Sequence, residues 1–206
     1  MSRQLTEQTL VVASHNQGKL REIRDLLKGF ALTVKSAGEL GLPEPDETED
    51  TYTGNAILKA KAAALASGFP ALSDDSGFEL MAINKAPGLY SARWAGPDKN
   101  FDHAMQKVWD AYQASGSDNR HARFVCALSI VWPDGHDETV EGIIDGSFVW
   151  PPRGKNGFGY DPVFVLDGHD QTFGEVDPEW KHSVSHRAKA FAQLLERCFS
   201  ETPRRH

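Results

Sequence analysis

The sequence predicts a single α/β domain over residues 1–206, and three observations lead to this prediction. Short apolar, β-branched runs alternate with segments of helical periodicity, which is the pattern of strands separated by helices. A length of 206 residues suits one domain and is ample for a hydrophobic core. The composition, with 25% charged and 40% hydrophobic residues, is that of an ordinary globular protein and excludes extensive disorder.

The first third of the chain predicts a strand–helix–strand unit, then a loop and a second helix. The run TLVVA is apolar and β-branched, as expected of a buried strand. Leucine and isoleucine then recur at helical spacing until Gly29. The Ala-rich stretch AILKAKAAALA favours a second helix. The predicted elements are strand 9–13, helix 20–27, strand 31–36, loop 37–50 and helix 51–67.

The rest of the chain predicts further strands and two more helices. Residues 71–73 and 78–83 bracket the polar run Asp74-Asp75-Ser76-Gly77, which is expected to follow the end of the first of these two segments. The turn signal Pro133-Asp134-Gly135 predicts a hairpin between two long strands. The predicted elements are a turn-rich stretch 86–97, helix 100–114, strands 124–132 and 139–148, loop 151–162, strand 163–166, helix 185–199 and a frayed tail 201–206.

Charge and composition exclude several classes of protein. A formal net charge of -7 argues against nonspecific binding to nucleic acid or to an anionic membrane. The sequence has no apolar window of about 20 residues and no secretory signal pattern. Its two cysteines, Cys126 and Cys198, have no C-x-x-C partner. We therefore expect a cytoplasmic protein without disulfides, whose partners are neither nucleic acid nor membrane.

Residues 14–19 (SHNQGK) lie between the first predicted strand and its helix. Such a junction presents free backbone N–H groups and the positive end of the helix dipole, which favours an anion. Lys19 opposes that dipole, and a bound anion would offset the cost. The segment does not match the P-loop pattern. The alternative is an ordinary helix N-terminus capped by Ser14 or Asn16.

Asp74 and Asp75 directly follow an apolar run. Adjacent carboxylates at the end of a strand repel each other unless a positive group lies beside them. Carboxylate oxygens favour magnesium or manganese over zinc. The alternative is a solvated turn. The acidic run 44–50 is more often a solvated loop, and it supplies ligands only if it folds back over the aspartates.

Asn55 and Lys59 are spaced i, i+4 and share one helix face, where they could hold phosphate oxygens. The alternative is a surface pair. At the other end of the chain, Ser185-His186-Arg187 opens a helix whose first turn is basic, with Lys181 just upstream. Because helix N-termini prefer acids, this inversion indicates a bound anion or an electron-rich acceptor. The alternative is a solvated basic turn.

The glycine-rich residues 154–161 (GKNGFGYD) carry two aromatic side chains. Glycines permit close approach of the backbone, and Phe158 or Tyr160 could stack on a planar base. The alternative is an ordinary turn whose aromatic residues belong to the core.

Six segments, taken together and in this order, resemble the inosine triphosphate pyrophosphatase family of enzymes for non-canonical purine nucleoside triphosphates. They are SHNQGK, NAILKA, SDDSGF, APGLYSARWAG, GFGYDPVF and SHRAKA. Each segment is weak evidence by itself, but the six together occur in the family's order, and the match covers nearly the whole chain. The resemblance implies an elongated mixed β-sheet flanked by helices, with two lobes around a central cleft, usually as a homodimer. It implies hydrolysis of ITP, dITP and XTP to the monophosphate and pyrophosphate, with Mg²⁺ as cofactor.

The resemblance also implies a role for individual residues. Asp75 would be the general base, and Ser76 would contact substrate. The implied triphosphate site is Ser14, His15, Asn16, Gln17, Gly18, Lys19, Asn55 and Lys59, the metal ligands are Glu47, Asp74 and Asp75, and the base pocket is Phe158, Gly159, Tyr160, Asp161, Lys181, His186 and Arg187. Two residues depart from the family pattern, since Gly54 stands where many relatives have Glu and Gly174 replaces a commoner Ala.

The hypothesis that follows is in-line attack of water on the α-phosphorus, with pyrophosphate as leaving group. Donors in the base pocket would select a 6-oxo purine, because the 6-amino group of adenine would leave them unpaired. Two alternatives stay open: a nucleotide-binding regulator without turnover, and a pyrophosphatase for pyrimidine or modified nucleotides. Pyrophosphate release from a panel of nucleoside triphosphates would distinguish the three.

Overall fold

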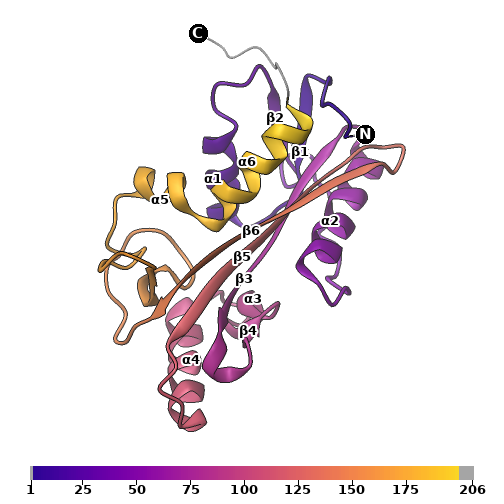
Figure 1. The fold of residues 1–206 in the computed structure, drawn as a ribbon. Helices are drawn as coiled ribbons and strands as arrows, with labels where there is room; N and C mark the ends of the chain where they lie inside the picture. The colour runs from indigo at the N-terminus through magenta and orange to yellow at the C-terminus, as the bar shows by residue number, and fades with distance from the viewer. Residues whose placement is uncertain (1, 200–206) are drawn as a thin grey trace. The chain divides into compact units, whose positions relative to one another are not determined.

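The computed structural model describes residues 2–199, which contain a seven-stranded sheet and six α-helices (Figure 1). The strands are β1 (Thr9–Val12), β2 (Thr33–Ser36), β3 (Ala71–Leu80), β4 (Pro87–Gly88), β5 (His121–Val131), β6 (Asp137–Phe148) and β7 (Phe164–Leu166). The helices are α1 (Gln17–Leu26), α2 (Tyr52–Ser67), α3 (Ser91–Trp94), α4 (Phe101–Ser115), α5 (Pro178–Val184) and α6 (His186–Cys198), with 3₁₀ turns at Met81–Ile83 and Asp161–Val163.

The sheet is mixed, with strand order β2-β1-β3-β5-β6-β7 and β4 paired to β3. β1 pairs in parallel with β2 and β3, whereas the β3–β4 and β6–β7 pairs are antiparallel. The predicted class, an α/β fold with a mixed sheet and flanking helices, is confirmed. Within residues 2–199, no helix is both long enough and apolar enough to cross a membrane. The predicted frayed tail, 201–206, lies outside the described residues.

The chain divides into two compact units. The first unit comprises the residues up to 75, residues 126–142 and those from 187 onward, and the second comprises residues 76–125 and 143–186. The first unit has helices on both faces of its strands. Leu10 and Val12 of β1 belong to the same apolar cluster as α1 and α6, whereas Val11 packs with alanines of α2. Because successive side chains of a strand point to opposite faces, α1 and α6 cover one face and α2 the other.

The core of the second unit is aromatic. Phe78 of β3 stacks on Tyr160 with ring centroids 5.0 Å apart, and it meets the ring of Phe124 edge to face. Phe164 of β7 packs against both Phe124 and Phe173. Helix α4 contributes its buried face, including Met105 and Val108, to the same cluster. These packed rings fix the segments that lead into and out of residues 154–161.

Most predicted elements are confirmed, but the expected end of the strand before residues 74–77 is wrong, and so is the alternative of a solvated turn there. Residues 71–80 form one continuous strand, and both Asp74 and Asp75 are buried within it. A carboxylate is tolerated in a buried strand only when it is paired and hydrogen-bonded, and here cations supply that pairing. The two aspartates hid the strand pattern in the sequence, because the sequence does not show the cations that neutralise their charges in the folded protein.

Helix α5 was not predicted, although its start carries a recognisable signal. Asp177 caps the helix by accepting from the backbone N–H groups of Glu179 and Trp180, and Pro178 occupies the first turn. At seven residues the helix is too short to display apolar periodicity.

Candidate active site

The first unit contains a buried chain of alternating charges around Asp74, which we call the Asp74 cluster (Lys19, Glu22, Asp74 and Arg187). Lys19 Nζ lies 2.6 Å from Asp74 Oδ1, and Arg187 Nε donates to Asp74 Oδ2 at 2.7 Å. Arg187 Nη1 donates in turn to Glu22 Oε2. The thiol of Cys126 also donates to Asp74 Oδ2, at 3.1 Å. Both oxygens of Asp74 are thus engaged by side chains of the protein itself.

These neighbours set the ionisation of the Asp74 cluster. Burial by itself would raise the pKa of Asp74, but the guanidinium of Arg187 and the ammonium of Lys19 hold that pKa well below its usual range. Burial and the carboxylate of Asp74 raise the pKa of the Cys126 thiol well above its usual value. Asp74 is therefore an anion at neutral pH, and Cys126 is a neutral hydrogen-bond donor.

A second group of polar residues, the Asp75 cluster, consists of Glu47, Asn55, Lys59 and Asp75. Lys59 Nζ lies 2.6 Å from Glu47 Oε1 and 2.9 Å from Asp75 Oδ1. Asn55 Nδ2 donates to Asp75 Oδ2 at 3.4 Å. Asn55 and Lys59 are only 3% and 5% exposed, so the alternative of a surface pair is wrong. The acidic loop does fold back toward the aspartates, since Glu47 shares the ammonium of Lys59 with Asp75.

The pKa values of the two carboxyls in the Asp75 cluster move in opposite directions. Burial raises the pKa of Asp75, and the neighbouring charge of Glu47 adds to this, although Lys59 and Lys19 oppose the shift. Burial also acts to raise the pKa of Glu47, but the ammonium of Lys59 outweighs it and leaves that pKa lowered. A carboxylate with a raised pKa accepts a proton more readily, which is the property required of a general base.

The alternation of side chains along β3 separates the two aspartates. Adjacent residues of a strand point to opposite faces of the sheet. Asp74 meets side chains from α1 and α6, and Asp75 meets side chains from α2. Each carboxylate therefore has its own cations, and the repulsion expected of neighbouring acids in a turn does not arise.

The SHNQGK segment is ordered by local hydrogen bonds. Asn16 Oδ1 accepts from the backbone N–H groups of Gly18 and Lys19, at 2.9 and 3.1 Å, so Asn16 is the N-cap of α1. Ser14 Oγ accepts from the N–H of Asn16, and His15 Nε2 lies 3.1 Å from the carbonyl oxygen of Leu42. The capping alternative is confirmed for Asn16, and the segment places Lys19 in the first turn, where its ammonium reaches Asp74.

In the second unit, Phe158, Asp161 and Lys181 form the Lys181 cluster. Lys181 Nζ donates to Asp161 Oδ2 at 2.6 Å, and both side chains are 3% exposed. Asp161 also accepts from the backbone N–H of Phe158, and the ammonium of Lys181 lies over the Phe158 ring, 5.0 Å from its centroid. The loop and the lysine are thus held as one structure by a single carboxylate.

The remaining predicted residues of the second unit have different surroundings. The imidazole of His186 stacks on Phe124, with centroids 4.8 Å apart. Tyr160 is 3% exposed, and its hydroxyl donates to the carbonyl oxygen of Ser91. Gly159 adopts a φ of 67°, which favours glycine, and Ser76 is half-buried in β3. The alternative of a core aromatic is therefore confirmed for Tyr160.

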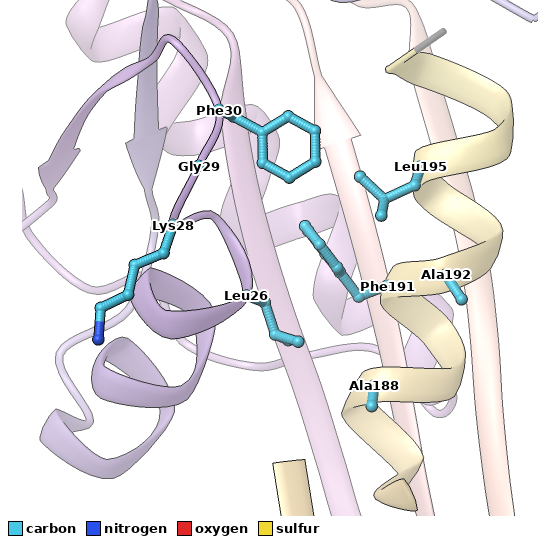
Figure 2. A pocket seen from close by; sticks show the side chains of 8 residues that line it. All are labelled: Leu26, Lys28, Gly29, Phe30, Ala188, Phe191, Ala192 and Leu195. Carbon is cyan, nitrogen blue, oxygen red and sulfur yellow. The ribbon is translucent and has the colours of Figure 1, made fainter. Parts of the chain in front are cut away.

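An apolar pocket of about 500 Å³ lies elsewhere in the first unit, between α6 and the C-terminal end of α1 (Figure 2). Phe30, Phe191 and Leu195 line it, and Lys28 is its charged residue. Lys19 and the segment SHNQGK lie at the opposite end of α1. The pocket contains none of the predicted site residues and has no carboxylate to hold a metal.

Glu47 and Asp75 have the oxygen ligands that a magnesium ion prefers. Within residues 2–199, no three or more His, Cys, Asp or Glu side chains are grouped to hold a metal by themselves. However, Mg²⁺ is commonly bound by one or two carboxylates together with substrate phosphates and water. Glu47 and Asp75 meet this description because an oxygen of each lies within 2.9 Å of one cationic atom, the ammonium nitrogen of Lys59, so the two carboxylates converge on a single position. The oxygens of Asp74 are taken by Lys19 and Arg187.

Sequence reasoning missed two members of this site, Glu22 and Cys126. Glu22 is three residues after Lys19 and four before Leu26, and it is 5% exposed. An acid spaced four residues from an apolar helix position is the signal that could have identified it, because a buried acid requires a partner. Cys126 had no such signal, since a cysteine in an apolar strand is usually a core residue.

A family model described as the Ham1 family matches residues 10–197. The chain belongs to the Ham1 family. Among curated relatives, the dITP/XTP pyrophosphatase of Rhodospirillum centenum is 59% identical over 200 residues, covering 96% of this chain and 98% of that protein. The dITP/XTP pyrophosphatase of Zymomonas mobilis is 54% identical over 197 residues, covering 95% and 94%. A solved HAM1 protein from Coxiella burnetii is 38% identical, with a TM-score of 0.84 over 91% of this chain and 96% of that one.

Proposed function

We propose that this Ham1 protein hydrolyses the non-canonical purine nucleoside triphosphates dITP, XTP and ITP to the nucleoside monophosphate and pyrophosphate. The observation that carries the proposal is the Asp75 cluster, in which one buried lysine lies 2.6 Å from Glu47 Oε1 and 2.9 Å from the buried carboxylate of Asp75. The relatives named dITP/XTP pyrophosphatase support it, because they match this chain over nearly its whole length.

The first unit would bind the triphosphate. Glu47 and Asp75 would hold Mg²⁺, which supplies neutralisation of phosphate charge when it is bound. Lys19 and Lys59 would stabilise charge on the leaving pyrophosphate, with help from Asn55 and the SHNQGK segment. Asp75 would accept the proton of the attacking water as that water approaches the α-phosphorus. Because Lys19 and Arg187 engage both oxygens of Asp74, we assign Asp74 to positioning Lys19 rather than to the metal.

The second unit would recognise the base. Lys181, oriented by Asp161, and His186 would donate hydrogen bonds to a 6-oxo purine, and Phe158 would offer a stacking surface. Adenine presents an amino group at this position and would leave those donors unpaired, which is the stronger form of discrimination. Arg187 is engaged by Asp74 and Glu22, so we assign it to the Asp74 cluster and not to the base.

The test measures pyrophosphate release from a panel of nucleoside triphosphates in the presence of Mg²⁺. We expect kcat/KM for dITP, XTP and ITP to exceed that for ATP by about 100-fold or more, since one buried donor left unpaired costs about 1–3 kcal/mol and more than one donor is affected. Equal rates for ITP and ATP would contradict the assignment of the base pocket. Absence of turnover across the panel would favour a nucleotide-binding regulator, and a preference for pyrimidines would favour the other alternative.

We further propose that the protein acts in the cytoplasm as a homodimer and does not bind nucleic acid. The resemblance to the pyrophosphatase family supports the dimer, and the net charge of -7 is consistent with a free nucleotide as ligand. Light scattering during size-exclusion chromatography gives the oligomeric state directly, and a mass near 22.7 kDa would exclude the dimer.

A further inference from the structure

Lys59 is placed where it competes with a cation. Its ammonium lies 2.6 Å from Glu47 Oε1 and 2.9 Å from Asp75 Oδ1, the two carboxylates suited to the metal. Its side chain is 6% exposed, and that of Asp75 is 8% exposed. The lysine is thus held by both partners in a setting where charges interact more strongly than they do in water.

The same contacts oppose the binding of a metal ion when no substrate is present. A divalent cation binding to Glu47 and Asp75 would bring two positive charges close to the ammonium of Lys59. It would also have to break two charge-assisted hydrogen bonds, which are among the stronger ones in proteins. Lys19 adds a further positive charge, because its field is felt by both Glu47 and Asp75.

We propose that Lys59 is an internal counter-ion that keeps the Glu47–Asp75 pair closed to metal until a polyphosphate arrives. The phosphate oxygens then offer the ammonium a new anionic partner, and the two carboxylates become available to the cation that accompanies the nucleotide. This inference rests on the proposed function for the identity of the metal ligands. It assigns a binding order: the metal loads with the triphosphate rather than before it.

The experiment measures Mn²⁺ binding to the nucleotide-free protein, by calorimetry and by the loss of the free-ion paramagnetic signal. The variants are Lys59→Met, which removes the charge, and Lys59→Arg, which retains it. We expect Lys59→Met to bind Mn²⁺ at least tenfold more tightly than the wild type, since one unit charge is removed from beside the site. Lys59→Arg is expected to bind as weakly as the wild type.

The matched control is Lys61→Met, because Lys61 lies on the same helix but is exposed. It removes the same charge from the molecule and should change Mn²⁺ affinity less than twofold. A thermal melt establishes that each variant is folded, and Lys59→Gln replaces Lys59→Met if the latter does not fold. Equal Mn²⁺ affinity in the wild type and the charge-removing variant would overturn the inference. No nucleotide is present, so this result is independent of whether the protein hydrolyses ITP.

Discussion

Asp74 and Asp75 are chemically identical neighbours whose environments differ at the scale of single atoms. Burial acts on both carboxyls in the same direction, toward a raised pKa. Asp74 has two cations in direct contact and a lowered pKa. The pKa of Asp75 is raised by burial and, to a smaller extent, by the charge of Glu47, which shares the ammonium of Lys59. One residue is thereby a permanent anion, and the other is able to take up a proton.

Replacement of Asp75 by Asn should lower kcat for ITP by about 100-fold or more, since it removes the proposed base. Because the amide oxygen of Asn can still accept the hydrogen bond from Lys59, the variant should remain folded. Pyrophosphate release and a thermal melt measure the two effects. Asp110→Asn, at an exposed position of α4, is the control. Near-normal turnover of the Asp75 variant would remove this residue from the role of base.

Replacement of Glu22 by Leu should destabilise the folded protein by about 3 kcal/mol, because it removes one partner of a buried charge pair. Arg187 is 1% exposed, and its guanidinium would lose the carboxylate of Glu22 as a partner. Urea denaturation of the variant and the wild type measures the difference. Glu196→Leu, an exposed change on α6, should stay within about 0.5 kcal/mol. Equal losses at the two positions would mean that the Glu22–Arg187 contact contributes nothing specific.

The two departures from the family pattern are explained by close packing. A Cβ atom on Gly174 would lie 2.5 Å from the carbonyl oxygen of Arg153, and one on Gly54 would lie 2.8 Å from Cβ of Glu49. Real Cβ atoms do not approach other atoms this closely, so backbone or side chain would have to move. Glycine at each position allows the neighbouring loop to lie against its element, the acidic loop against α2 in the case of Gly54.

At the scale of elements, α5 serves to position Lys181. The helix has seven residues, too few to be stable by propensity alone, so its ends are decisive. Asp177 satisfies two backbone donors at the N-terminus, and Ser185 N–H bonds to the carbonyl of Lys181 at the C-terminus. A cap that holds a short helix therefore also holds the lysine proposed to read the base.

Replacement of Asp177 by Ala should lower stability by about 1 kcal/mol, the usual cost of a lost N-cap. Because Lys181 is on the same helix, KM for ITP should rise more than kcat falls. Steady-state kinetics and urea denaturation give the two quantities. Asp167→Ala, at an exposed position outside the helices, should change neither. An unchanged KM in a measurably destabilised Asp177 variant would separate the cap from base recognition.

Elements with local signals were predictable, and those that depend on distant partners were not. The Ala-rich α2 and the Asn-capped α4 carry their own propensities and caps, and they appear within a residue or two of the predicted bounds. β3 was misjudged because its acids are compensated by residues far away in sequence, such as Arg187, 113 positions from Asp74. The short helix α5 was not predicted from the sequence because its stability comes from caps and packing rather than from an apolar repeat.

At the scale of the whole molecule, the carboxyls make stability depend on pH. The pKa values of Asp74, Glu138 and Asp145 are lowered in the folded state. A carboxyl of this kind contributes stability above its unfolded pKa, about 4 for these residues, and the contribution is lost as pH falls through the folded value. Asp75 has the opposite sign, because its raised pKa destabilises the neutral-pH protein and protonation relieves that effect.

The free energy of unfolding should therefore fall as pH drops below about 4, with Asp75 offsetting part of the loss. Urea denaturation at a series of pH values between 3 and 7 measures the dependence. Asp74→Asn should give a shallower acid limb than the wild type, because a lowered carboxyl pKa has been removed. Unchanged stability between pH 3 and 7 would show that the paired carboxyls do not govern acid sensitivity.

The residues of the site were predictable where they lie in recognisable sequence motifs. Lys19, Lys59 and Asp75 could be proposed from segments whose order resembles a known family. Their contacts could not, because the sequence does not say which cation pairs with which acid. Packing between segments distant in the chain brings these charges together. Arg187 pairs with Glu22 and Asp74, and Lys59 pairs with Glu47 and Asp75.

The first unit is assembled from three separate stretches of chain, and α6 is the last of them to be synthesised. Its buried residues Ala190, Phe191 and Leu194 belong to the same apolar core as Leu10 and Leu20. The chain order therefore places the side chains that complete this core, and the guanidinium that pairs with Asp74, after the other two stretches of the unit. A chain that lacks α6 would therefore lack the guanidinium of Arg187, and the carboxylate of Asp74 would keep only Lys19 of the two cations described here.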